Sequence, residues 1–366
     1  MDTINFAAHQ VPNSDLFLNL LDQVWQSNIH TNNGPMVKRF EKEISEQFES
    51  DKFVAVSNGT LAIEIAIRMI KTTYPDKTIV LTTPFTYIAT IAAIKNSGLG
   101  IYYIDIDEDD LGMSPGSLKT TLEGKVKIED VLAILPVHPF NNVTKIDMIS
   151  NIAASFSIPV IYDASHALGT KFNNIHATSF GTFSTVSFHA AKTLSTSEGG
   201  GLFVNEKSYF ESVKNFRSFG FNKDGEFELI GTNGKMSELH AIHGLTSLVD
   251  FRNNINIRKQ IFHNFYTTLN SECYSAVQIA TGTESNYGYF PILTKNIEAR
   301  ESLEKKLIDA KIGFRRYFYP SLDILVPADG ATQISNKIAD KILCIPLRAN
   351  LNFTEIERIR YFLASI

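Results

Sequence analysis

Short apolar runs alternate with helix-like stretches through the first two-thirds of the chain, and this alternation constrains the fold most strongly. Residues 53–56, 100–105 and 131–137 are apolar runs of strand length, bounded by turn residues. The stretches between them, such as 61–70 and 88–96, have the apolar content and length of helices. Strands that are separated by helices of this length need crossover connections. The sequence therefore predicts an α/β fold with a mostly parallel central sheet flanked by helices.

The pattern changes near Met236. Residues 239–259 have a helical pattern, and the remainder, with 287–293 as a strand, is shorter α+β material. A chain of 366 residues is also too long for one typical small domain. We expect a large α/β domain over residues 1–245, which includes the N-terminal segment, and a smaller C-terminal α+β domain over residues 246–366.

Composition disfavours several classes of partner. The formal net charge is −5 and no basic stripe stands out, so we expect no nucleic-acid partner. No apolar run has the length of a membrane span, and the first residues do not form a signal peptide, so we expect no membrane association. Cys273 and Cys344 lie in separate segments and are expected to be buried thiols, which agrees with a cytoplasmic location.

The sequence offers no pattern typical of a metal site. His138, His166 and His189 lack the short paired spacing of zinc ligands. The acidic run at residues 105–110 lacks the glycine that a calcium-binding loop needs at its sixth position. We therefore expect no metal and interpret the acidic run as a solvated loop.

Lys192 lies in a segment, residues 187–201, that follows a strand-like run and ends in three glycines. This setting favours a desolvated amine, which is the form that a lysine nucleophile must take. The apolar run 158–162 ends at Asp163, and a carboxylate there needs a cationic partner to offset its desolvation. A protonated pyridine nitrogen would be such a partner. An acid for a ring nitrogen and an amine for an aldehyde together indicate pyridoxal phosphate.

The candidate residues follow different strands of the predicted sheet. Asn58, Phe85, Asp163 and Lys192 all fall where strands end, and parallel sheets bind ligands at that edge. Residues 57–60 lie between a strand and a helix, where N–H groups and the helix dipole attract an anion. The sequence thus predicts one composite site.

Several ordered motifs resemble those of one family. Residues 162–167 and 187–192, with 198–200 behind them, look like the nucleotide-sugar aminotransferases of the DegT/DnrJ/EryC1/StrS family. The resemblance extends from about Thr31 to the C-terminus. Further matching segments are residues 31–35, 57–60, 83–87, 233–237 and 343–347. The family has the aspartate aminotransferase-like fold type I, so the resemblance implies that fold and a cofactor that cycles between pyridoxal and pyridoxamine phosphate.

The resemblance assigns roles to the residues nearest the cofactor ring. It implies that Lys192 binds the cofactor and moves the proton between substrate and cofactor, and that Asp163 pairs with the pyridine nitrogen. His166 occupies a family position that touches the phenolic oxygen. Tyr87 is expected to stack on the ring, with Phe85 as the other candidate.

The resemblance also assigns a phosphate site. The amides of Gly59, Thr60 and Leu61, with the hydroxyl of Ser187, correspond to the phosphate cradle. Asn233 is expected to reach the same phosphate from the partner subunit, because family members resemble homodimers with shared active sites.

Cationic residues are candidates for binding the nucleotide diphosphate: Lys235, Arg315 and Arg316. The sequence departs from the family at Asn141, where relatives carry glycine, and we expect an altered loop near the cofactor.

Two segments, residues 31–35 and 233–237, favour the branch that makes dTDP-4-amino-4,6-dideoxyglucose. The implied reaction is transamination of a nucleotide-linked 4-keto-6-deoxyhexose, with L-glutamate as donor, for surface glycan or O-antigen synthesis. A 3-keto-6-deoxyhexose aminotransferase of the same family remains open, as does a non-catalytic pyridoxal-phosphate-binding regulator. The regulator lacks a visible DNA-binding segment. A sugar dehydratase is disfavoured, because related dehydratases carry histidine where this chain has Lys192.

Overall fold

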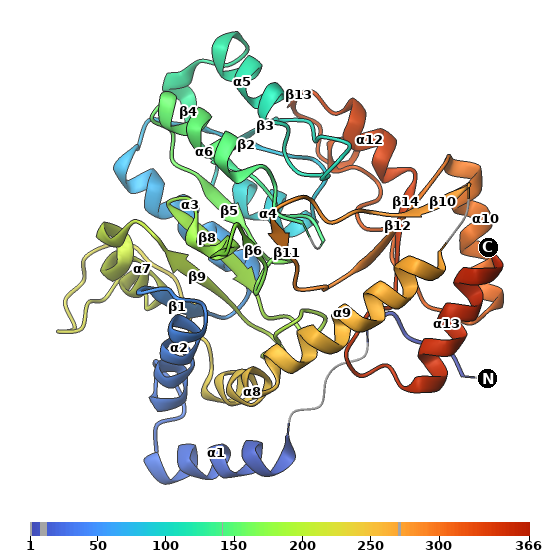
Figure 1. Ribbon diagram of the computed structural model, residues 1–366. Helices are drawn as coiled ribbons and strands as arrows, with labels where there is room; N and C mark the ends of the chain where they lie inside the picture. Colours follow the sequence, from blue (N-terminus) through green and yellow to red (C-terminus); the bar gives the residue numbers. More distant parts are fainter. Residues whose placement is uncertain (1, 8–12, 141, 270–271) are drawn as a thin grey trace.

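A large central sheet organises the molecule, as the computed structural model shows (Figure 1). The structure describes residues 2–7, 13–140, 142–269 and 272–366. The departure from the family pattern at Asn141 lies outside the described residues.

The main sheet has the strand order β13-β3-β2-β4-β5-β8-β9-β1, in which parallel bridges from Ile134 to Val160 and from Val137 to Asp163 join its two halves. Strand β9 runs antiparallel to both of its neighbours, and the remaining pairs are parallel. The predicted mostly parallel sheet is therefore confirmed. Its strands are β1 (Phe53–Val56), β2 (Ile79–Thr82), β3 (Gly100–Tyr103), β4 (Val131–Leu135), β5 (Ile161–Asp163), β8 (Phe183–Ser187), β9 (Gly200–Val204) and β13 (Asp329–Gly330).

Helices cover both faces of this sheet, and each face has its own apolar core. One core includes Phe40, Ile149 and Leu245; the other includes Ile67 and Ile91. Burial on both faces explains why strands such as β4 are continuous apolar runs. The helices of this part are α1 (Ser14–Ser27), α2 (Pro35–Gln47), α3 (Gly59–Thr73), α4 (Ile88–Asn96), α5 (Pro115–Gly124), α6 (Ile146–Ser155), α7 (Phe210–Arg217) and α8 (Glu238–Val249).

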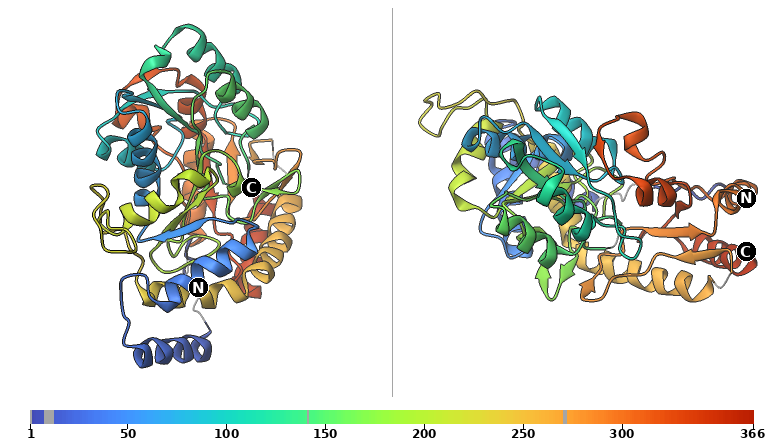
Figure 2. Two further views of the ribbon diagram at one scale, coloured as in Figure 1. Left: turned by 90° about the vertical axis from the view of Figure 1, so that its left-hand side faces the viewer. Right: turned by 90° about the horizontal axis from the view of Figure 1, so that it is seen from above.

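The C-terminal part forms a smaller α+β layer around an antiparallel sheet with the order β10-β12-β14 (Figure 2). A third apolar core, with Phe265, Phe290 and Leu303, lies between this sheet and its helices. The helical run expected over 239–259 divides at Asp250 into α8 and α9. The elements are α9 (Phe251–Thr268), β10 (Tyr274–Ala276), β12 (Phe290–Thr294), α10 (Ile297–Asp309), α11 (Leu322–Leu325), α12 (Gln333–Ala339), β14 (Ile342–Ile345) and α13 (Phe353–Ser365). A small separate sheet contains β6 (Lys171–Phe172), β7 (Ile175–His176) and β11 (Thr283–Glu284).

Two segments cross the expected domain boundary. Ile4 bridges to Ile312 and is buried in the third core, so this N-terminal residue packs with the C-terminal part. In the other direction, β13 pairs with β3, and Leu322 is buried in a core of the large sheet. We propose two domains, residues 1–245 and 246–366. The segment around Ile4 packs with the C-terminal domain, and the segment with Leu322 and β13 packs with the large domain.

The acidic run at residues 105–110 is not wholly solvated. Asp105 and Asp110 are only 4% and 2% exposed. The carboxylate of Asp105 accepts hydrogen bonds from the amides of Ile334 and Ser335, each at 2.8 Å. Asp105 thus satisfies donors in the first turn of α12 from a distant part of the chain, and the solvated-loop interpretation is wrong for these two residues.

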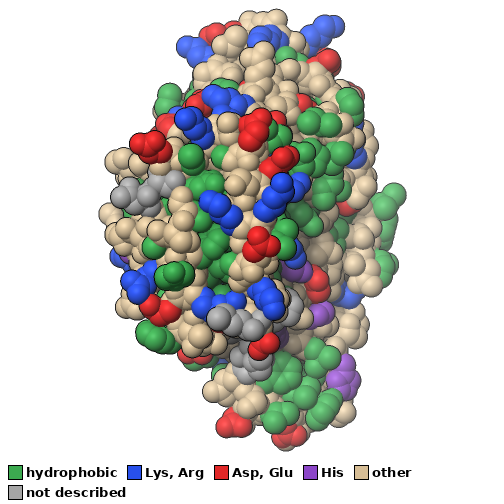
Figure 3. All heavy atoms as spheres, turned by 90° about the vertical axis from the view of Figure 1, so that its right-hand side faces the viewer, with side chains coloured by type: hydrophobic (Ala, Val, Ile, Leu, Met, Phe, Trp, Pro, Cys, Tyr) green, Lys and Arg blue, Asp and Glu red, His purple; other side chains and the backbone are tan. Residues whose placement is uncertain are grey.

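The length of the helices and the distribution of surface charge bear on the expected absence of membrane and nucleic-acid partners. No helix of the described residues is both long and apolar enough to cross a membrane. Figure 3 shows basic and acidic side chains interspersed on the face that carries α10 and α13.

Candidate active site

A cavity of about 230 Å³ lies at the carboxyl edge of the main sheet. It is bounded by the first turn of α3, the start of α4, the ends of β5 and β8, and residues from the C-terminal part. The predicted residues that line it are Gly59, Thr60, Tyr87, Asp163, His166, Ser187 and Lys192. The structure therefore brings these seven side chains and amides together, from segments up to 133 positions apart.

Asp163 is the last residue of β5 and is 5% exposed. Its carboxylate accepts a hydrogen bond from the Thr90 hydroxyl at 2.8 Å and another from the Ser165 amide at 3.1 Å. These two donors fix the orientation of the carboxylate at the cavity wall. The arrangement can hold a cationic ring nitrogen, because a buried carboxylate is stabilised by a positive partner.

Lys192 lies in the loop between β8 and β9 and lines the same cavity as Asp163. Burial lowers the pKa of Lys192 to about 8, since desolvation disfavours the ammonium form, and the charge of Asp163 opposes this shift. The Lys192 amine therefore loses its proton far more readily than a solvated lysine. Such an amine can act as a nucleophile or as a base.

The glycines after Lys192 allow close packing at the base of the loop. A Cβ atom at Gly200 would lie 2.4 Å from the backbone carbon of Asn58, and one at Gly201 would lie 2.2 Å from the Phe53 ring. Only residues without a Cβ let β9 approach β1 and the start of α3 this closely.

His166 is 8% exposed, and its Nδ1 accepts a hydrogen bond from the Phe140 amide at 3.3 Å. Burial holds the pKa of His166 well below its usual value, and the charge of Lys192 adds to this effect. The ring is therefore neutral, and its proton is on Nε2. The Nε2–H group is a donor for a ligand oxygen.

The start of α3 forms an anion site next to Ser187. The Gly59 and Thr60 amides are in the first helical turn and have no acceptor within the helix. A Cβ atom on Gly59 would lie 2.8 Å from the Ser187 Cβ, so glycine is needed for this close approach. Leu61 differs from the expectation: its amide donates to the Asn58 side chain at 2.8 Å, and Leu61 does not line the cavity. Asn58 caps the helix, which leaves Gly59 and Thr60 as the candidate cradle.

The two aromatic candidates for ring stacking occupy different places. Tyr87 precedes α4, lines the cavity and is 56% exposed. Phe85 is fully buried and packs edge-on against Phe318, with ring centroids 5.3 Å apart. Tyr87 is thus the residue available to a ligand, and Phe85 belongs to the core.

Asn233 and Lys235 do not line the cavity of their own subunit. They lie between α7 and α8, where the Lys235 amine donates to the Asn233 side chain at 2.5 Å and lies 4.4 Å from the Phe219 ring. Their roles toward a phosphate or diphosphate in the partner subunit remain predictions.

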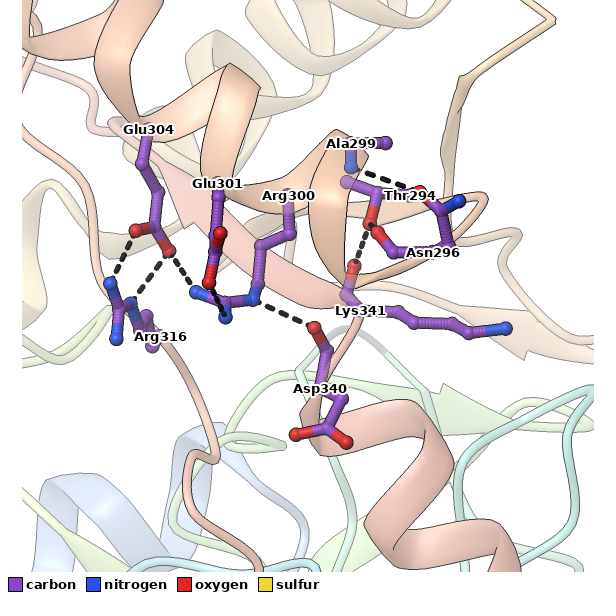
Figure 4. Close-up of polar contacts among 9 residues, drawn as sticks. All are labelled: Thr294, Asn296, Ala299, Arg300, Glu301, Glu304, Arg316, Asp340 and Lys341. Carbon is purple, nitrogen blue, oxygen red and sulfur yellow. Dashed lines mark hydrogen bonds and ion pairs between the residues drawn. The ribbon is translucent and has the colours of Figure 1, made fainter.

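Arg316 forms an ion pair within the C-terminal part. Its guanidinium forms a bidentate ion pair with Glu304, which also pairs with Arg300 at 2.5 Å (Figure 4). Arg316 does not line the cavity, and its expected role toward a diphosphate remains a prediction. Arg315 does not line the cavity either, but its charge lies near Tyr317, which does.

The sequence interpretation missed an aromatic wall. Tyr289, Tyr317 and Phe318 line the cavity from the C-terminal part. The Lys192 amine donates to the Tyr289 hydroxyl at 3.4 Å, and the Tyr289 and His166 rings lie 4.3 Å apart. The aromatic cluster at residues 287–290 was interpreted only as a strand. Its signal was weak, since aromatic residues are common in buried strands.

The fold and the site define an α/β enzyme of the aminotransferase class, with a desolvated lysine and a buried carboxylate in one cavity. The sequence model of the DegT/DnrJ/EryC1/StrS aminotransferase family matches residues 13–363, and the chain belongs to this family. Among the described residues, no cluster of three or more His, Cys, Asp or Glu could hold a metal ion.

Two relatives of this chain are both named dTDP-4-amino-4,6-dideoxy-D-glucose transaminase. The protein from Shigella dysenteriae is 31% identical over 95% of each chain, and that from Escherichia coli is 29% identical over 96% of this chain and 95% of its own. A solved structure from Bacillus cereus, described as a putative PLP-dependent aminotransferase, is 26% identical, with a TM-score of 0.89 over 99% of this chain and all of its own.

Proposed function

We propose that this aminotransferase uses pyridoxal phosphate and L-glutamate to aminate dTDP-4-keto-6-deoxyglucose. The product is dTDP-4-amino-4,6-dideoxyglucose, a precursor for surface glycan or O-antigen synthesis. The observation that carries the proposal is that the desolvated Lys192 amine and the oriented Asp163 carboxylate line one cavity. The names of the two curated relatives support the choice of sugar.

The cavity residues fit the cofactor group by group. The amides of Gly59 and Thr60 and the Ser187 hydroxyl present donors to a phosphate, at a place that a Cβ on Gly59 would fill. Asp163 would hold the ring nitrogen in its protonated form. His166 would donate its Nε2 proton to the phenolic oxygen.

Tyr87 completes this set, because its exposed ring can cover the face of a bound pyridine. When bound, pyridoxal phosphate supplies an aldehyde that carries the amino group and a ring that accepts the electrons of the broken C–H bond.

Lys192 supplies the proton-transfer group in both halves of the proposed reaction. Its pKa of about 8 leaves a useful fraction of neutral amine near pH 7, and this amine removes the proton from the donor carbon. The resulting ammonium would pass this proton to the cofactor carbon that bears the amino group. In the sugar half, the amine would take a proton from that carbon and deliver it to the sugar carbon. Asp163 keeps the ring charge paired in both halves, since Thr90 and Ser165 hold its carboxylate in place.

We propose a homodimer in which Asn233 and Lys235 serve the partner's site. Both residues lie outside their own cavity, beside exposed apolar side chains such as Phe219 and Ile230, which are 50% and 85% exposed. Exposed apolar side chains of this size are typical of a surface that another chain covers.

We also propose a cytoplasmic location, which the buried thiol of Cys344 supports. Cys273 is exposed, so the expectation of a buried thiol is wrong for this residue.

The test is a reaction of purified protein with pyridoxal phosphate, excess L-glutamate and dTDP-4-keto-6-deoxyglucose, followed by NMR of the product. We expect a 4-amino sugar with an equatorial amine. A 3-amino product from the corresponding 3-keto sugar would favour the alternative member of the family. Cofactor binding without conversion of glutamate would favour a non-catalytic regulator.

A further inference from the structure

A second, smaller cavity of about 40 Å³ adjoins the main cavity at Lys192. Lys192, Ala191 and Tyr289 line both cavities. The other lining residues come from the N-terminal segment, the loop after β8, the end of α8, α9, the segment just before β12, and the end of β14 with the segment that follows it. The cavity exceeds the space of one water molecule but is too small for a sugar or a nucleotide.

Arg258 of α9 is the dominant charge on this wall. It is 8% exposed, and its guanidinium donates to the Leu347 carbonyl at 2.6 Å and to the Gly288 carbonyl at 3.4 Å. Among the described residues no carboxylate lies within 4.0 Å of it, and its Nε atom is buried without a partner. The residues outside the description include no Asp or Glu. A buried guanidinium without a counter-charge is costly unless an anion accompanies it.

Arg348 adds a second guanidinium to the same cavity. It pairs with Glu355 at 2.8 Å, and its Nε atom is also buried without a partner among the described residues. Since Glu355 compensates Arg348, the charge of Arg258 remains uncompensated. Burial lowers the pKa of Arg258 to about 10, and the charge of Arg348 adds to this effect, so Arg258 is still cationic at neutral pH.

We propose that the Arg258–Arg348 cavity binds a carboxylate group of the amino donor. A carboxylate matches the fork of guanidinium N–H groups and supplies the missing negative charge. The cavity adjoins the Lys192 amine, where the donor's amino group must react. The sugar substrate offers no carboxylate, so this site serves only the donor half of the reaction. The identity of the donor rests on the proposed function, whereas the anion site itself does not.

The first test measures the binding of glutarate, a dicarboxylate that lacks the amino group, by calorimetry. We expect Arg258→Gln to raise the Kd for glutarate at least about tenfold, and Arg258→Lys to raise it less because the charge remains. Arg252→Gln, an exposed arginine on the same helix, is the matched control and should leave the Kd unchanged. An unchanged Kd in folded Arg258→Gln would overturn the proposal.

A second pair of variants leaves Arg258 in place, so that the test does not depend on the folding of Arg258→Gln. Ser247 lines the cavity, and Ser247→Asp would supply the missing carboxylate from the protein itself. We expect Ser247→Asp to abolish glutarate binding, whereas the neutral Ser247→Asn of the same shape retains most of it. Equal glutarate affinity in these two variants would contradict the proposed carboxylate site.

Kinetics then separate this inference from the proposed function. In single turnover, Arg258→Gln should slow the half-reaction with L-glutamate and leave the half-reaction with the keto sugar at the wild-type rate. A failure of the sugar to react in wild-type protein would count against the proposed substrate but would leave the dependence of glutarate binding on Arg258 intact. Equal slowing of both half-reactions would identify Arg258 as a structural residue and overturn the donor site.

Discussion

The Lys192 amine lies 3.4 Å from the hydroxyl oxygen of Tyr289, and this contact joins two parts of the chain that are 97 positions apart. Burial raises the pKa of Tyr289 well above its usual value, so the hydroxyl stays neutral and can accept from the lysine. The Tyr289 ring also lies against His166. We therefore predict that Tyr289 is a positioning residue, which holds the Lys192 amine in place at the cavity.

Tyr289→Phe tests this role. Removal of the hydroxyl takes an acceptor from the ammonium form, so we expect the pKa of Lys192 to fall and the turnover number to drop by up to about tenfold. The measurement is the pH dependence of the glutamate half-reaction. Tyr287→Phe, which alters a neighbouring tyrosine outside the cavity lining, is the control. A pH profile that is identical in Tyr289→Phe and wild type would argue against the positioning role.

Lys192 itself is predicted to be indispensable for the chemistry. Lys192→Ala removes the amine that we propose binds the cofactor and transfers the proton, and we expect activity to fall by at least about 10²–10⁴-fold. The absorbance of the lysine-bound cofactor should disappear with it. Lys235→Ala, which removes a lysine outside the same cavity, should retain that absorbance. Persistence of the absorbance in Lys192→Ala would show that another lysine binds the cofactor.

The burial of Lys192 also predicts a pH-dependent cost in stability. The pKa of Lys192 is about 8 in the folded chain, whereas a solvated lysine, as in the unfolded chain, has a pKa of 10.5. The unfolded chain therefore binds more protons than the folded chain between these two pH values. Stability must therefore rise with pH across this window, and the difference of about 2.5 pKa units corresponds to about 3 kcal/mol. Lys192→Met should raise the free energy of unfolding of the cofactor-free protein at pH 7. Urea titrations at pH 7 and pH 10.5 should show the gain shrinking as the pH rises; an equal gain at both would contradict the assignment.

Part of the site could be predicted from the sequence. Asp163 and Lys192 follow apolar strands, and a parallel sheet brings strand ends to one edge, so their proximity was predictable. Tyr289 was not, because it reaches the site from the C-terminal part, and only tertiary packing decides which aromatic residues face a cavity. The ion pair of Arg316 could not be predicted for a similar reason. Its partner Glu304 lies twelve positions away on α10, and no local sequence pattern predicts this ion pair.

The Glu304 ion pairs give a prediction on stability. Glu304 is 6% exposed and holds both Arg300, which is 2% exposed, and Arg316. Glu304→Gln removes the closest counter-charge of the buried Arg300 guanidinium and leaves the exposed Glu301 at 3.8 Å, so we expect it to lower the free energy of unfolding by about 3 kcal/mol. Glu301→Gln, which alters an exposed partner of the same arginine, should change it by less than about 1 kcal/mol. Urea denaturation measures both values.

Arg316→Ala tests whether Arg316 has a role beyond its ion pair with Glu304. If Arg316 serves only the ion pair with Glu304, then Arg316→Ala should reduce stability without changing the KM for the nucleotide sugar. A rise in KM of tenfold or more in folded Arg316→Ala would support its expected role toward the diphosphate.

Gly59 is predicted to set the affinity for the cofactor phosphate. A methyl group at this position would lie 2.8 Å from the Ser187 Cβ and 3.3 Å from its hydroxyl oxygen, so Gly59→Ala must push Ser187 away from the start of α3. The displacement separates the hydroxyl from the helix amides, and we expect the Kd for pyridoxal phosphate to rise at least about tenfold, which corresponds to one charge-assisted hydrogen bond. Gly124→Ala is the matched control, because a Cβ at Gly124 would meet no atom within 4 Å. Fluorescence titration of the cofactor-free proteins compares the two variants. Equal affinities in Gly59→Ala and Gly124→Ala would mean that the phosphate binds elsewhere and that the close approach of Ser187 to α3 serves packing alone.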